Sequence, residues 1–207
     1  SLFLLPSLFC QEGILPALTP KGAALLLRLR EPNEVVQNLR GSPLANAIVN
    51  GPVADQLRRE GKIAQLREFI EATENLYGFK LKKLLKKLAS REVVLAIYPG
   101  KVVRQPKILL LCQGKEGVKA EEILVPLTEK LVNYGHLYPT EPLEIQGERL
   151  RCFVDSHGKD LVLLTKERFT LLSNDKEIAK RAVLIAKGNP SDSVLTSPHL
   201  ITTCQNF

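Results

Sequence analysis

The alternation of hydrophobic and polar residues is clearest in the last third of the chain. Residues 149–154 alternate basic and apolar side chains, and residues 161–164 and 169–172 are short apolar runs. Both patterns are typical of β-strands. The polar segments between them are short, which predicts two antiparallel hairpins. The Ser-Asn-Asp sequence at 173–175 is a typical helix N-cap, so we expect a helix from there to Gly188.

Three further strands are predicted before this region. Residues 23–29 are mostly apolar and lie between proline-containing turns, and residues 93–98 and 108–112 are rich in Val, Ile and Leu. Such residues favour strands with at least one buried face. Because the last two runs follow each other closely in sequence, we expect them to form adjacent antiparallel strands at the centre of a sheet.

Helical spacing of apolar residues accounts for most of the remaining chain. A first helix is expected from Asn33, and the Gly-Ser-Pro sequence at 41–43 ends it and starts a second helix at residues 44–48. A longer helix follows, with Gly61 as its weak point. Its predicted apolar side consists of Leu57, Ala64, Leu66, Phe69 and Ile70. Another helix covers residues 119–134, where Pro126 should kink the helix or mark a late start.

These elements predict an α+β domain over residues 14–188. The expected order is β-ααα-ββ-α-βββ-α, which gives a mainly antiparallel sheet with helices packed on one face. Residues 189–207 are then a tail. Residues 194–201 echo residues 41–48, so we expect the tail to be the start of a truncated second unit.

The segment at residues 80–89, KLKKLLKKLA, is strongly amphipathic. Its leucines share one side of a helix, and the rest of its surface is a candidate anion-binding face made of Lys80, Lys82, Lys83, Lys86 and Lys87. This pattern occurs in helices that lie on membrane surfaces and in stripes that bind nucleic acid. A helix packed on a core with solvated lysines has the same pattern. We favour this third interpretation, because a free helix this short is marginal in water.

Composition and charge narrow the function only slightly. The chain has 207 residues, of which 44% are apolar and 25% charged, and these are ordinary values for a globular protein. Its formal net charge of +7 permits contact with nucleic acid or lipid headgroups without requiring it. Methionine is absent, so we expect a processed chain or a fragment.

Residues 1–13 begin with an apolar stretch that is too short to span a bilayer. The stretch is similar to the hydrophobic part of a secretory signal peptide without its basic start. We therefore expect an exported protein of the periplasm or cell envelope, cleaved near Cys10. One alternative is lipid attachment at Cys10, which the bulky Phe9 disfavours. The other is a hydrophobic N-terminal strand in a cytoplasmic protein.

The sequence contains no recognisable catalytic or metal-binding motif. GxSxG, HExxH, GxGxxG and CxxC are all absent, so we predict no catalytic residue, no cofactor and no metal. Cys112 and Cys152 fall in predicted strands and would form a disulfide only if those strands were neighbours, and we favour free thiols. Asp155, His157 and Asp160 lie at a predicted hairpin tip, where an exposed turn is a simpler interpretation than a polar site.

Four segments together resemble a known sequence pattern: the entry into the first strand at 18–29, the Ser-Pro-Leu helix start at 42–44, the helix-to-strand segment at 78–96, and the strand, turn, strand and helix start at 160–183. This order resembles a bacterial family of predicted exported proteins with an uncharacterised domain, a domain of unknown function, often present as two units. The resemblance spans residues 18–201 and implies no catalytic residues. This chain is richer in lysine than is usual in that family.

The function expected from the sequence is that of a non-catalytic, exported module that binds a protein or a cell-envelope component. We lean against an enzyme. The alternatives are binding of an anionic polymer or a membrane surface through residues 80–89, and an enzyme of unrecognised type. Nucleic acid is the less expected partner, and peripheral membrane contact stays open.

Overall fold

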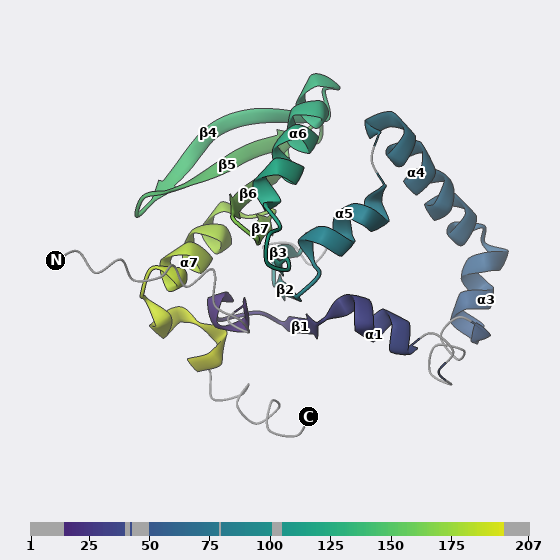
Figure 1. Cartoon of the computed structure of the whole chain (residues 1–207), viewed down its shortest axis with the longest axis horizontal. Coiled ribbons are helices and arrows are strands. Elements are labelled where there is room, and N and C mark those ends of the chain that lie inside the picture. The colour runs from purple at the N-terminus through teal and green to yellow at the C-terminus, as the bar shows by residue number, and fades with distance from the viewer. Residues whose placement is uncertain (1–14, 40–41, 43–49, 79, 101–104, 197–207) are drawn as a thin grey trace.

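The computed structural model describes residues 15–39, 42, 50–78, 80–100 and 105–196. In this part of the chain the centre is a seven-stranded sheet in the order β1-β2-β3-β7-β6-β5-β4, and every neighbouring pair is antiparallel (Figure 1). The strands are β1 (Leu25–Arg30), β2 (Glu92–Tyr98), β3 (Lys107–Gln113), β4 (Leu137–Ile145), β5 (Glu148–Asp155), β6 (Asp160–Lys166) and β7 (Phe169–Ser173). The predicted α+β class and antiparallel sheet are confirmed.

Helices connect the strands and flank the sheet. They are α1 (Pro32–Leu39), α3 (Pro52–Arg59), α4 (Lys62–Tyr77), α5 (Leu81–Leu88), α6 (Ala120–Asn133) and α7 (Lys176–Ala186). The element order follows the prediction in outline. The single longer helix expected through Gly61 is instead two helices, α3 and α4. They separate at Gly61, the expected weak point, which has a positive φ of 69° that glycine adopts without strain. The helix expected at 44–48 and the signal-like residues 1–13 lie outside the described residues.

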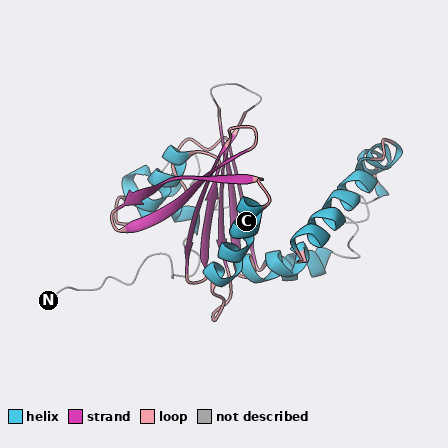
Figure 2. Cartoon of the chain, turned by 90° about the horizontal axis from the view of Figure 1, so that it is seen from above, coloured by secondary structure: helices cyan, strands magenta, loops and turns pink. Residues whose placement is uncertain are grey.

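The helices cover both faces of the sheet, so the prediction of helices on one face is wrong in this respect (Figure 2). On one face, α7 packs Ile178, Ala182 and Val183 against a core that includes Leu111 and Leu164. On the other face, residues of α5 and α6 pack against β5 and β6. The reason lies in the apolar run of β6, because consecutive apolar residues in a strand point to opposite faces and both must be covered.

The sequence prediction also missed strand β4, which raises the strand count from six to seven. Pro139 and Pro142 lie within it, and proline cannot donate a ladder hydrogen bond. The strand is tolerated because it is at the edge of the sheet and because its register with β5 shifts between Thr140 and Leu143. By contrast, Pro126 lies inside α6, which begins before it, so this proline does not mark a late helix start.

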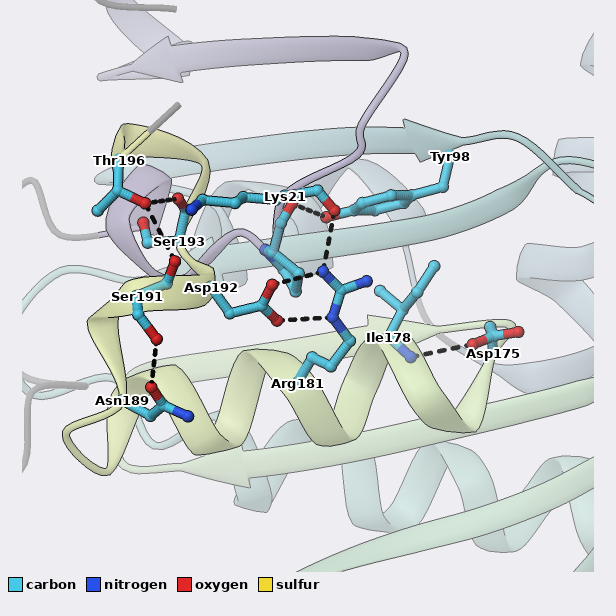
Figure 3. Close-up of polar contacts among 11 residues, drawn as sticks. Lys21, Tyr98, Asp175, Ile178, Arg181, Asn189, Ser191, Asp192, Ser193 and Thr196 are labelled. Carbon is cyan, nitrogen blue, oxygen red and sulfur yellow. Dashed lines mark hydrogen bonds and ion pairs between the residues drawn. The ribbon is translucent and has the colours of Figure 1, made fainter. Parts of the chain in front are cut away.

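The two ends of the described region lie side by side (Figure 3). Pro20 forms a β-bridge with Ser193, and the carbonyl of Pro20 accepts a hydrogen bond of 2.9 Å from the Tyr98 hydroxyl. Val194 is buried and its amide donates to the Thr19 carbonyl at 2.7 Å. The predicted domain boundary at residue 188 therefore does not coincide with the end of the packing, because residues 190–196 contact the domain. The second unit expected after it stays a prediction.

The helical segment α3–α4 stands away from the sheet (Figures 1 and 2). Helix α4 packs chiefly against α3, and α5 then returns the chain to the sheet. Among the residues that the structure describes, no helix has both the length and the apolar character needed to cross a membrane.

Candidate binding groove between α5 and α6

Helix α5 presents its leucines on two different sides. Leu88 is 5% exposed and packs with Leu124 and Ala120 of α6, and Leu84 joins the same cluster from the helical turn before it. Leu85 is 50% exposed. The predicted core-packed helix with solvated lysines therefore describes one side of α5, whereas Leu85 lies on a side that is open to solvent.

Contacts at its C-terminal end fix α5 relative to α6. The Ser90 hydroxyl donates to the carbonyl of Lys87 at 3.1 Å and accepts a hydrogen bond from the Lys115 amide at 2.8 Å. Gly114 lies against the same carbonyl, because a Cβ at this position would be 2.9 Å from the Lys87 oxygen. The loop that leads into α6 therefore also holds the end of α5.

A groove of about 430 Å³ runs between the two helices. Its apolar floor is formed by Leu84 of α5 and by Ile123, Pro126 and Leu127 of α6. Its rim carries four lysines: Lys80, Lys83, Lys87 and Lys130. Gly78 also lines the groove, and Lys130 Nζ lies 3.7 Å from where a Cβ on Gly78 would be. The groove thus combines apolar surface with a positively charged rim.

Only part of this positive charge is compensated. Lys80 Nζ lies 3.0 Å from a carboxylate oxygen of Glu74. In the described part of the chain, Lys83 and Lys87 have no carboxylate partner. These two lysines are one helical turn apart, so their Cβ atoms are neighbours on the helix surface at about 6 Å. The rim is therefore suited to an anion or to two carboxylates at helical spacing.

The structure divides the five lysines of the predicted anion-binding face. Lys80, Lys83 and Lys87 line the groove, whereas Lys82 and Lys86 do not. Helical spacing places Lys82 and Lys86 near Leu85, on the side of α5 away from the groove. Sequence reasoning missed Lys130, because its part in the rim depends on the packing of α6 against α5, which no local pattern encodes.

The carboxylates at the hairpin tip, Asp155 and Asp160, form contacts that stabilise the fold locally. The Asp155 carboxylate accepts hydrogen bonds of 2.8 Å from the amides of Lys159 and His157. The hydrogen bond from the Lys159 amide is the main cause that lowers the pKa of Asp155. Asp160 pairs with Lys176 at 3.1 Å. Each of these carboxylates thus has a structural partner.

Cys112 and Cys152 are free, buried thiols. They lie on β3 and β5, which β7 and β6 separate in the sheet, so the condition for a disulfide between neighbouring strands is not met. Within the described ranges, no three His, Cys, Asp or Glu residues are placed so that they could hold a metal ion.

Comparisons with known proteins add no relative to this description. The resemblance inferred from sequence stays a prediction. No model of a protein family, no curated protein and no solved structure matches the chain.

Proposed function

We propose that the protein is a non-catalytic binding module whose α5–α6 groove holds an acidic, amphipathic segment of a partner protein. One observation carries the proposal: an apolar floor lies directly beside two lysines, Lys83 and Lys87, that lack acidic partners in the described chain. The formal net charge of +7 also favours an acidic partner over a basic one.

The chemistry of the groove fits a helix or an extended chain with apolar and acidic side chains on one edge. Apolar side chains of the partner would bury against Leu84, Ile123 and Leu127, and burial of one such side chain stabilises a complex by about 1.5–3 kcal/mol. Carboxylates would meet Lys83 and Lys87 at the rim. Solvent-exposed ion pairs contribute about 0.2–1 kcal/mol each and weaken with salt. They therefore contribute more to the specificity of binding than to its affinity.

A membrane surface is the second candidate, and a different part of α5 favours it. Leu85 is 50% exposed, with Lys82 and Lys86 near it in the helix. An exposed apolar residue with lysines near it on the same helix is suited to a flat anionic lipid surface. The α5–α6 groove, by contrast, is concave, so it suits the projecting side chains of a peptide segment and not a flat surface. The two candidates therefore use different lysines of the same helix.

Export of the protein is part of the proposal, and its support is the apolar pattern of residues 1–9. Fractionation of cells that make the natural gene product would test it. Recovery of the protein in the cytoplasmic fraction alone would contradict export and leave the groove proposal standing.

The test of the groove uses a labelled helical peptide with leucines on one side and glutamates at i,i+4 beside them. Fluorescence anisotropy measures its binding to the intact protein and to the double variant Lys83→Gln/Lys87→Gln. We expect about tenfold weaker binding in this variant, which corresponds to about 1.4 kcal/mol. The matched control Lys82→Gln/Lys86→Gln removes the same charge from the same helix and should change the affinity less than about twofold.

The opposite result would contradict the proposal. If the control pair weakens peptide binding as much as the groove pair, only net charge matters. A second pattern would identify a membrane surface as the partner. In that case the peptide fails to bind, vesicles with anionic headgroups bind the protein, and Lys82→Gln/Lys86→Gln abolishes vesicle binding whereas Lys83→Gln/Lys87→Gln does not.

A further inference from the structure

A second concave site lies on the other side of α6, at the edge of the sheet. It has a volume of about 470 Å³ and is open to solvent. It is lined by Glu121 of α6, by Pro139, Thr140 and Pro142 of β4, by Arg149, Arg151, Cys152 and Phe153 of β5, and by Leu163 and Thr165 of β6. It shares no lining residue with the α5–α6 groove.

An irregularity in β4 forms this site. Thr140 pairs with Cys152 and Leu143 pairs with Leu150, so β4 has one residue more than β5 between the two pairs. The two residues of β4 in this interval therefore lie opposite Arg151 alone, which is the geometry of a β-bulge. Pro142 is one of them and has no amide hydrogen to donate to the ladder. Bulges re-aim side chains at sheet edges, and this one leaves a hollow beside Arg151.

Two guanidinium groups line the hollow without acidic partners. Arg149 and Arg151 are two residues apart in β5, so they share one face of the strand. Among the described residues, neither side chain forms an ion pair or a hydrogen bond. By contrast, Arg58, Arg91 and Arg181 each pair with a carboxylate. Glu121 lines the same hollow, and Glu129 lines an adjoining one beside Arg151, yet neither is paired with an arginine of the site.

Apolar side chains form the wall beside the two arginines. Pro139, Phe153 and Leu163 line the same hollow. Phe153 is two residues after Arg151 in β5, so its side chain is on the same face of the strand as the two arginines. A ligand in the hollow would therefore contact positive charge and apolar surface together.

We propose that this hollow binds a small organic anion, with a carboxylate or a phosphate held by Arg149 and Arg151 and an apolar body against Phe153. The planar guanidinium presents paired donors that match the oxygens of either group, and such charge-assisted hydrogen bonds are strong. Glu121 opposes anions and limits the affinity. The proposal does not depend on the function of the α5–α6 groove.

Thermal shift and isothermal titration on the intact protein test the site with three probes: benzoate, phenyl phosphate and inorganic phosphate. We expect benzoate or phenyl phosphate to raise the melting temperature, and whichever binds more tightly identifies the anion. Arg149→Gln and Arg151→Gln should each weaken this binding about tenfold or more, as the loss of a charge-assisted hydrogen bond would. The control Arg67→Gln removes the same charge from α4 and should change the affinity less than about twofold.

Two further variants separate binding from folding. Thr140→Val should leave binding unchanged, because Thr140 pairs with Cys152 and its side chain is on the face of the sheet opposite the two arginines. Glu121→Gln should strengthen binding. The proposal is wrong if none of the three probes binds, if Arg67→Gln weakens binding as much as the site variants do, or if inorganic phosphate binds as tightly as phenyl phosphate, since the apolar wall would then have no role.

Discussion

Arg181 and Asp192 form a bidentate ion pair, with Nε 2.6 Å from Oδ2 and Nη2 2.7 Å from Oδ1 (Figure 3). Nη2 also donates to the carbonyl of Lys21 at 3.1 Å. One guanidinium of α7 thus binds the segments at both ends of the described region. Tyr98 lies beside it, and burial is the main cause that raises its pKa, so its hydroxyl stays a hydrogen-bond donor at neutral pH.

The first prediction concerns this pair. Asp192→Asn should lower the free energy of unfolding by about 1 kcal/mol, near the lower end for bonds to charged groups because both side chains are about one-third exposed. Urea denaturation at pH 7 measures this. The matched control is Asp55→Asn, which removes a more exposed i,i+3 pair with Arg58 and should cost less than about 0.5 kcal/mol. If both variants lose the same free energy of unfolding, the contact of Arg181 with both ends of the described region adds no stability beyond that of a surface ion pair.

The stability that the Arg181–Asp192 pair contributes also depends on pH. The hydrogen bond from Arg181 is the main cause that lowers the pKa of Asp192. A carboxylate with a lowered pKa in the folded state stabilises the fold above its unfolded pKa, about 3.9 for Asp. The stability difference between the wild type and Asp192→Asn should therefore be constant near neutral pH. It should shrink as the pH falls below about 4 through the folded-state pKa.

The second prediction concerns Glu148, which is 8% exposed. Its Oε1 lies 2.6 Å from the Nζ atoms of both Lys166 and Lys187. Burial acts to raise the pKa of Glu148, but the hydrogen bonds from the two lysines outweigh it, and the pKa is lowered. Glu148→Gln would leave two ammonium groups facing a neutral amide, so we expect a loss of about 2 kcal/mol in a denaturant titration.

A second substitution checks the cause of that loss. If repulsion between the lysines contributes, adding Lys187→Gln to Glu148→Gln should restore part of the stability. A double variant that is less stable than either single variant would contradict this. The wild type should also lose this contribution on acidification below about pH 4.3, the ordinary Glu value, because its folded-state pKa is lowered.

The strands were the most predictable part of the fold. Residues 149–154, 161–164 and 169–172 fall within β5, β6 and β7. The first segment shows the period of two of a strand with two different faces, and the other two are short apolar runs of the kind found in strands that are covered on both faces. The cap of α7 was equally local: the Asp175 carboxylate accepts a hydrogen bond of 2.9 Å from the Ile178 amide, as the capping pattern predicted. In both cases neighbouring residues alone determine the result.

The remainder depends on contacts that no short segment encodes. Strand β4 was hidden by Pro139 and Pro142, which are acceptable only because the strand is at an edge and bulged. The pairing of β3 with β7 joins distant segments. Likewise, Lys82 and Lys83 are equivalent in the helical pattern, yet only Lys83 lines the groove, because the position of α6 decides which side of α5 is covered.

The third prediction concerns the reactivity of the two buried thiols. Burial raises the pKa of Cys112 to about 12 and also raises that of Cys152. The reactive species is the thiolate, so both should be inert at pH 8 in the folded protein. Labelling with a thiol reagent should be done on a Cys10→Ser/Cys204→Ser variant, which leaves only these two. We expect two thiols per chain to react in denaturant and none without it. Rapid labelling of the native protein would show that the sheet opens at β3 or β5.

The last prediction links the packing at Gly114 to the groove. A Cβ at this position would lie 2.9 Å from the carbonyl oxygen of Lys87 and 3.1 Å from side-chain atoms of Val118. The carbonyl belongs to the end of α5 and already accepts a hydrogen bond from Ser90. Gly114→Ala must therefore move the end of α5 away from α6. We expect a loss of about 1–3 kcal/mol in stability, typical of overpacking, together with weaker binding of the acidic peptide.

Gly147→Ala is the control that separates these two effects. Gly147 has a φ of 81° and open space around its Cβ position, so alanine there is strained but contacts nothing. It should lower stability by about 1 kcal/mol and leave peptide affinity unchanged. If Gly114→Ala lowers stability and also leaves peptide affinity unchanged, then α5 is not positioned by this contact.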